Sequence, residues 1–216
     1  MALQSLTLLF FLLFFLLLVS SSSALVQDFC VADRSLPQTA AGFACKSLNK
    51  VTIDDFTFSG LDKPGNKSAL AKVSFNAFTV DEIPGLNGLG LTLGRIDMDP
   101  KSAFPMHSHP GTTEAVLMVQ GTVTAGFISS TANTVYSKTL NPGDAIVMPA
   151  GLLHFVVNSG NKPASAYVFL NSELPPIQAT SLALFQNDLP TDVVQATTFL
   201  DAQQIKKLKA VFGGTN

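Results

Sequence analysis

All three histidines of the chain lie within residues 107–158. His107 and His109 are separated by one residue, and His154 follows a turn-forming segment at residues 149–151. Side chains two residues apart on a strand point to the same face, so His107 and His109 are expected to project together. Because neutral imidazole is the commonest metal ligand in proteins, the pattern indicates a metal centre.

A carboxylate completes the candidate ligand set. Pro110 and Gly111 predict a turn, and Glu114 then begins an apolar segment, so a hairpin would bring Glu114 beside the two histidines. A single histidine on an apolar strand is more commonly a hydrogen-bonded core residue, and a His-x-His pair alone is a short motif, but no histidine of this chain lies outside the pattern. Four ligands would leave open positions on a six-coordinate ion, as metal catalysis requires. We therefore predict one metal ion bound by His107, His109, Glu114 and His154.

The elements that must position these residues read as short β-strands. Apolar residues alternate with polar ones or form short runs, and turn residues separate the runs. Regular short strands of this kind are typical of an all-β sandwich or barrel. Strands are expected at residues 73–77, 89–98, 114–120, 123–128, 135–140, 145–148, 153–157 and 166–170.

The C-terminal section changes to helical periodicity. Asp201 and Gln204 have the spacing of a capping box, and Gly213 is placed to end the helix. The predicted apolar face consists of Ile205, Leu208, Val211 and Phe212, and the predicted polar face of Lys206, Lys207 and Lys209. A shorter helix is expected to begin at residues 190–192. The apolar face could pack on the chain's own barrel or on a neighbouring subunit, and the residues alone favour neither.

The first residues have the composition of a signal peptide. Residues 6–19 are almost all Leu and Phe, residues 20–24 are small, and the apolar run is too short for a comfortable membrane span, although no Lys or Arg precedes it. We expect residues 1–24 to be removed and the protein to be secreted. The remaining chain of about 190 residues suits one domain. We divide it into an N-terminal extension at residues 25–60, a β-barrel at residues 61–190 and C-terminal helices at residues 191–216.

Two modifications are expected in a secreted chain. Cys30 and Cys45 are the only cysteines, and an even count outside the cell predicts a disulfide rather than two free thiols. Closing this loop would contribute roughly 3 kcal/mol on the entropic model. Asn66 begins an Asn-Lys-Ser sequon among turn residues, so N-glycosylation in an exposed loop is predicted, with an unused sequon as the alternative.

Charge and hydropathy narrow the classes of partner. Thirteen basic and fifteen acidic residues give a formal net charge of −2, and no basic run stands out, which argues against nucleic acid. No segment after residue 19 is long and apolar enough to span a bilayer.

Two sequence motifs resemble those of the germins and germin-like proteins, in the cupin superfamily. The first motif is His107-x-His109, four residues, Glu114, six residues, Gly121. The second is Gly143, five residues, Pro149-x-Gly151, two residues, His154, three residues, Asn158. The resemblance extends over residues 26–214 and is closest to the plant germin-like proteins described as auxin-binding.

This resemblance implies a jelly-roll β-barrel with a short C-terminal helical section. It also implies manganese ligands at His107, His109, Glu114 and His154, a Cys30–Cys45 disulfide, and an extracellular location in the apoplast or cell wall. The C-terminal helices would clasp a neighbouring subunit, giving trimers that pair into hexamers. Manganese rests on the resemblance alone, because imidazole-rich sites also suit Zn, Cu, Fe and Ni.

The resemblance leaves three functions open. A manganese site with an open position could dismutate superoxide. Oxalate oxidases of this family carry two asparagines near the metal, at the positions of Phe104 and Gly94, neither of which offers a hydrogen bond to a carboxylate, so we predict no oxalate oxidase activity. The alternatives are a binding protein for a small acid such as auxin, and a wall-associated defence or structural protein.

Overall fold

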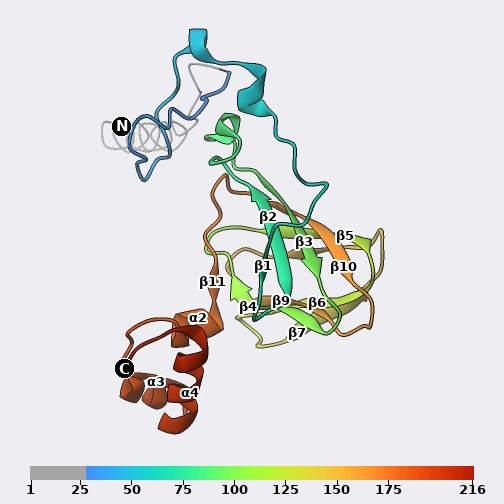
Figure 1. Cartoon of the computed structure of the whole chain (residues 1–216), viewed down its shortest axis with the longest axis vertical. Helices are drawn as coiled ribbons and strands as arrows, with labels where there is room; N and C mark the ends of the chain where they lie inside the picture. The colour runs from blue at the N-terminus through green and yellow to red at the C-terminus, as the bar shows by residue number, and fades with distance from the viewer. Residues whose placement is uncertain (1–27) are drawn as a thin grey trace, which may run out of the picture.

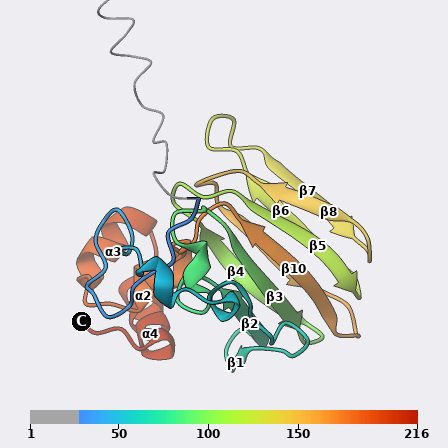
Figure 2. The same cartoon turned by 90° about the horizontal axis from the view of Figure 1, so that it is seen from above.

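Two antiparallel β-sheets pack face to face in the computed structural model, which describes residues 28–216 (Figures 1 and 2). The predicted signal peptide at residues 1–24 lies outside the described residues. In strand order, the first sheet contains β1 (Asn66–Ser68), β2 (Val73–Phe78), β3 (Thr92–Met98), β10 (Ala164–Leu170), β5 (Glu114–Gln120) and β8 (Ala145–Met148). The second contains β11 (Gln178–Ala179), β4 (Ser102–Ser108), β9 (His154–Asn158), β6 (Val123–Ile128) and β7 (Val135–Leu140).

The core of this two-sheet barrel follows from the period-two alternation of its strands. On β3, Thr92, Gly94, Ile96 and Met98 are buried and face the interior, and the residues that alternate with them are partly buried. β5 of the same sheet adds Val116 and Met118, and the second sheet adds Ala125 on β6 and Val156 on β9, so the two sheets enclose one apolar core. The all-β prediction is confirmed, and β5, β6, β7 and β8 have the predicted bounds.

Three helices follow the barrel: α2 (Thr180–Phe185), α3 (Thr191–Thr198) and α4 (Ala202–Phe212). Together with the residues between and after them they form a helical module, residues 180–216, which β11 joins to the barrel (Figure 1). The side chain of Asp201 accepts hydrogen bonds from the backbone N–H groups of Gln203 and Gln204, so the predicted cap of α4 is confirmed. The sequence did not predict α2.

The predicted faces of α4 need two corrections. Val211 is 54% exposed, so it does not belong to the apolar face formed by Ile205, Leu208 and Phe212. Lys209 was placed on the polar face but is only 3% exposed. Its Nζ donates to the carbonyl oxygens of Asn187, Leu189 and Thr215, at 3.3, 2.6 and 2.6 Å. These carbonyl acceptors offset the cost of burying the ammonium group, which helical periodicity alone does not reveal.

The N-terminal extension lies at one end of the barrel and contains two short 3₁₀ helices, η1 (Leu48–Lys50) and η2 (Ile53–Phe56) (Figure 1). A third, η3 (Pro84–Leu86), contacts η2 from the loop after β2. Cys30 and Cys45 form a disulfide that closes the first loop of the extension. Asn66 is exposed, although it lies in the edge strand β1 rather than in the loop we expected. None of the helices within residues 28–216 is long and apolar enough to cross a bilayer.

Candidate metal centre

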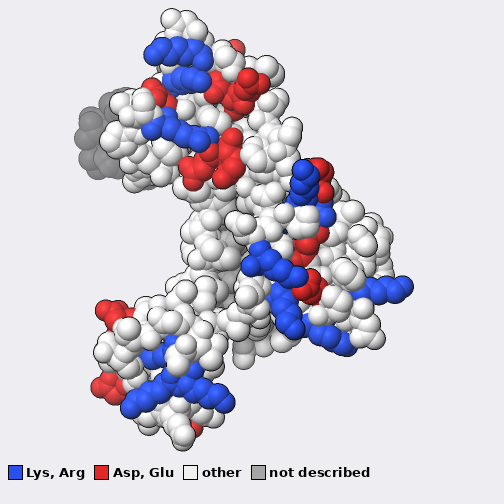
Figure 3. Space-filling view, in the orientation of Figure 1, with Lys and Arg blue, Asp and Glu red and all other residues white. Residues whose placement is uncertain are grey.

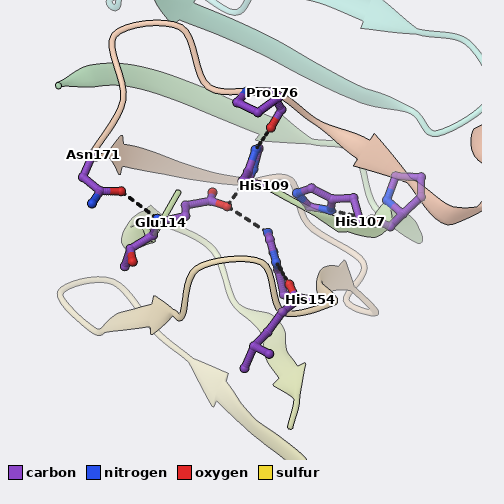
Figure 4. A network of polar contacts seen from close by, with 9 residues as sticks. His107, His109, Glu114, His154, Asn171 and Pro176 are labelled. Atoms are coloured by element: carbon purple, nitrogen blue, oxygen red, sulfur yellow. Dashed lines mark hydrogen bonds and ion pairs between the residues drawn. The ribbon is translucent and has the colours of Figure 1, made fainter. Parts of the chain in front are cut away.

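The three histidines and Glu114 come from both sheets and meet inside the barrel (Figure 4). On the second sheet, His107 near the end of β4 pairs directly with His154 at the start of β9. His109 follows the end of β4. Glu114 begins β5 on the opposite sheet, after the turn in which the N–H of Thr112 donates to the carbonyl of His109. The predicted turn therefore carries the chain from one sheet to the other.

All four side chains are buried, and one nitrogen or oxygen from each lies within 4.8 Å of the others. The Oε2 atom of Glu114 is 3.0 Å from Nε2 of His154 and 3.3 Å from Nε2 of His109. The ring of His107 lies 4.1 Å from the ring of His154, measured between centroids. The structure thus brings together all the residues that the sequence nominated as ligands.

Backbone carbonyl groups fix the orientation of each imidazole. The Nδ1–H groups donate to the carbonyl oxygens of Pro105, Pro176 and Leu152 from His107, His109 and His154, at 2.7, 2.8 and 2.8 Å. A carbonyl oxygen only accepts, so Nδ1 must carry the proton and Nε2 has a free lone pair in the neutral ring. Metal-binding histidines typically have such an outer hydrogen bond, which sets the tautomer.

The pKa values of His107 and Glu114 favour the protonation states that bind a metal ion, a neutral imidazole and an ionised carboxylate. Burial and the neighbouring His154 lower the pKa of His107 to about 4, so its imidazole is neutral at pH 7. Burial alone would raise the pKa of Glu114, but hydrogen bonds from His109 and His154 lower it to about 2. Burial also disfavours protonated His109, but its hydrogen bonds to Glu114 and Pro176 outweigh this and raise its pKa above 6.5.

The composition and spacing of the group fit a metal ion. An ion about 2.1 Å from each donor leaves opposite donors roughly 4.2 Å apart, close to the largest separation found here. Three neutral imidazoles and one carboxylate carry a single negative charge, which a divalent cation would more than balance. The carboxylate also has no Lys or Arg partner among the described residues, although a buried charge normally needs one. Both the donor types and their spacing therefore suit a metal ion.

Residue types in the sequence gave no sign of the groups that support the site. The carbonyls of Pro105, Leu152 and Pro176 carry no signal, because every residue has one. Asn171 accepts the N–H of Thr113 beside the site (Figure 4). Asn158, the last residue of the second motif, is not a ligand. Its side-chain amide donates to the carbonyls of Asp99 and Lys162 and so ties together three segments at the far end of β9.

Facing antiparallel sheets with a buried group of three histidines and one glutamate define a metal-binding cupin, and residues 59–206 match the cupin family. The auxin-binding protein ABP19a of Prunus persica is 53% identical, with 89% of this chain and 92% of that protein covered. Germin-like protein subfamily 3 member 3 of Arabidopsis thaliana is 50% identical, with 89% and 91% covered. The chain belongs to the germin-like proteins of the cupin family.

Solved structures agree with this placement. A recombinant oxalate oxidase in complex with glycolate superposes with a TM-score of 0.82 at 34% identity, over 87% of this chain and 96% of that one. An oxalate decarboxylase of Lactobacillus farciminis in a formate complex, at 19% identity and a TM-score of 0.59, shares the fold over 67% of this chain and 40% of that one. The jelly-roll prediction is therefore confirmed.

Proposed function

We propose that this chain is a secreted germin-like protein in which His107, His109, Glu114 and His154 bind one manganese ion, and that it dismutates superoxide. The observation that carries the proposal is the convergence of three Nε2 atoms and a carboxylate, with each Nδ1 fixed by a carbonyl oxygen. Manganese is chosen over other divalent metals because of the family, since the donor set itself accepts several.

When bound, manganese would supply the one-electron redox chemistry that converts superoxide into oxygen and peroxide. The chain supplies the rest. Its carbonyls hold the three rings in position, and the single charge of Glu114 offsets part of the charge of the cation. The apolar barrel interior beyond the site, around Val116 and Met118, limits the entry of water and of larger ligands.

Two matched measurements test this proposal. The protein secreted by plant cells should contain close to one manganese per chain by elemental analysis, and should remove superoxide in proportion to its manganese content. Protein stripped with a chelator should lose the activity and regain it with manganese. Full superoxide dismutation by the stripped protein, or stoichiometric binding of another metal in the native protein, would contradict the proposal.

We propose that oxalate is not a substrate. The positions at which the resemblance places two asparagines hold Phe104 and Gly94, and the ring of Phe104 packs on that of His107 at 4.6 Å. No hydrogen-bond donor is available there for a second carboxylate. Peroxide should not be released when the manganese-loaded protein is given oxalate; release at ordinary enzymatic rates would contradict this.

A second candidate function is the binding of a small acid such as auxin, which the name of the relative from Prunus persica favours. The cavity within the barrel core has a volume of only about 10 Å³, which is close to the minimum for one water molecule. An indole ring therefore does not fit inside without movement of core side chains. Calorimetry with indole-3-acetic acid and the metal-loaded protein tests this candidate, and it separates auxin binding from a purely structural role in the wall.

We also propose that the chain forms homo-oligomers. An apolar groove of about 660 Å³ runs between the barrel and the helical module. Its apolar lining includes Leu70, Phe75, Ile177, Leu182 and Phe212. Figure 3 shows that the hollow beside the helical module is lined mostly by uncharged side chains. Exposed apolar surface of this kind is typical of an interface, and a second copy of the chain is the occupant that the family resemblance suggests.

A further inference from the structure

Within residues 28–216, three methionines are buried in the barrel core, and one of them, Met148, lies beside the candidate metal centre. Met148 on β8 pairs directly with Glu114 on β5, so the two side chains point to the same face of the sheet. Side chains that are directly opposite in an antiparallel pair have Cβ atoms about 4.5–5.5 Å apart. Met148 has no exposed surface. Its thioether is therefore enclosed in the core next to a proposed metal ligand.

The other methionines of the described chain differ from Met148 in distance from the centre or in exposure. Met118 is buried but follows Glu114 by four residues on β5, which is roughly 13 Å along the strand. Met98 is buried at the far end of the barrel, where its backbone carbonyl accepts a hydrogen bond from the side chain of Asn158. Met106 on β4 is partly exposed. These residues provide internal references for any reaction that takes place at the centre.

Hydrogen peroxide can oxidise a thioether without any other reagent. The sulfur lone pair attacks one peroxide oxygen, the O–O bond breaks, and the second oxygen leaves as water after proton transfer. The sulfur loses two electrons and becomes a sulfoxide, and the peroxide is reduced. On the other side of Glu114, its partner on β10 is Leu170, whose aliphatic side chain does not react in this way. Peroxide formed at the centre would therefore meet Met148 as its nearest oxidisable sulfur.

We propose that Met148 is the first methionine to be oxidised by peroxide formed at the metal centre, and that its sulfoxide ends turnover. This inference rests on the proposed function, because superoxide dismutation supplies the peroxide. A sulfoxide is polar, whereas the thioether is apolar. Every buried side-chain nitrogen and oxygen within residues 28–216 already has a hydrogen-bond partner, so the new oxygen finds no free side-chain donor. It would lie next to the ionised carboxylate of Glu114 and disturb the position of that ligand.

The test locates methionine sulfoxide by peptide mass spectrometry after superoxide turnover. Manganese-loaded and stripped protein receive the same superoxide from xanthine oxidase, with catalase present to destroy peroxide that reaches the bulk solution. In the loaded protein, we expect Met148 to be oxidised at least about tenfold more than Met98, with Met106 remaining reduced. In the stripped protein, Met148 should remain reduced.

Bulk hydrogen peroxide, given to stripped protein without superoxide or catalase, should reverse this order. Access from solvent then determines the rate, so the partly exposed Met106 should be oxidised first and the buried Met148 spared. Oxidation of Met148 during turnover would then reflect where the peroxide forms, and not an unusual reactivity of this side chain.

Met148→Leu removes the sulfur with little change in volume. This variant should keep the manganese content and the initial rate of the wild type, and should lose activity during turnover at least about threefold more slowly. Met98→Leu is the matched control, because it makes the same change in the same core far from the centre. It should lose activity at the rate of the wild type.

Met148 that remains reduced while the loaded protein removes superoxide would overturn the inference, as would equal oxidation of Met148 and Met98. Loss of activity by Met148→Leu as fast as by the wild type would show that the sulfoxide does not end turnover. The mass-spectrometric test uses the wild type and so does not depend on how well the variant folds. A loaded protein that does not remove superoxide is a separate result, read by the superoxide assay, and would overturn the proposed function together with the inference.

Discussion

Backbone carbonyl groups orient the three histidine side chains of the candidate metal centre. Each imidazole donates a hydrogen bond from Nδ1–H to a backbone carbonyl oxygen. For His107 and His154 this carbonyl belongs to the residue two positions earlier in the chain, Pro105 and Leu152. His109 instead reaches Pro176, close to β11. The histidine side chains are therefore oriented before any ion binds, so little rotamer entropy remains to be lost on binding.

His109 should make the affinity for the metal depend on pH. Metal binding needs a neutral imidazole, and the pKa of His109 is raised above 6.5, whereas those of His107 and Glu114 are lowered to about 4 and about 2. Below the raised pKa of His109, binding must release its proton, so the apparent affinity should rise about tenfold per pH unit and level off above it. Competition titrations from pH 5 to 9 measure this slope. A flat profile across that range would contradict it.

Glu114→Gln tests the carboxylate with little change in size. The amide removes the negative charge, so manganese affinity should fall by at least the roughly 10–100-fold typical of losing a supporting residue. The pKa of His109, measured by NMR on the metal-free protein, should fall because burial then acts without the carboxylate. Glu173→Gln, outside the site, is the control and should keep the affinity of the wild type.

Among the elements, α4 shows what holds the helical module together. Ile205 is buried together with Phe185 and Val194. Lys209 follows one turn later on the same helix and donates hydrogen bonds to three backbone carbonyls. Two of these lie between α2 and α3, and the third lies after α4. Lys209→Met preserves the length of the side chain and removes the lysine donor from these carbonyls, of which only that of Asn187 keeps another donor, the N–H of Thr215. Unfolding free energy should fall by about 1–3 kcal/mol.

The matched change Lys207→Met removes an exposed lysine from the same helix, and we expect it to alter stability by less than about 0.5 kcal/mol. Denaturant titration of both variants, followed by circular dichroism, compares them. Equal stability of the two variants would mean that the carbonyls are well hydrated without Lys209.

Periodicity and turn residues predicted the long elements well. Alternation of apolar residues located β5 to β8, and the capping box located the start of α4. The sequence did not predict β1 and β11, because two or three residues carry too little pattern to distinguish from a loop, or α2, because no side chain caps its start. The donor set was nominated from residue types, yet its geometry depends on the β4–β9 register, which no local pattern specifies.

At the scale of the whole molecule, the apolar groove between barrel and helical module should control assembly. Leu182 lines the groove and is partly exposed. Leu182→Asp would bury a charge against any second copy bound there, at a cost of several kcal/mol, and should shift the protein to monomers. Light scattering after size-exclusion chromatography measures the mass.

Val135→Asp is the control for assembly, because Val135 is exposed on the edge strand β7 and outside the groove. It should leave the oligomer mass unchanged. A wild-type protein that is already monomeric at micromolar concentration would show that the groove does not join copies of this chain.

The pairing of His107 with His154 joins strands that four others separate along the chain. A chain emerging from the ribosome cannot form this pair until almost the whole barrel has been synthesised, so an early intermediate lacks the complete set of four donors. Binding of the proposed metal ion by all four donors would then be one of the last steps of folding. These four donors suit several metals. The cations present in the compartment where folding finishes would therefore determine which metal the protein binds.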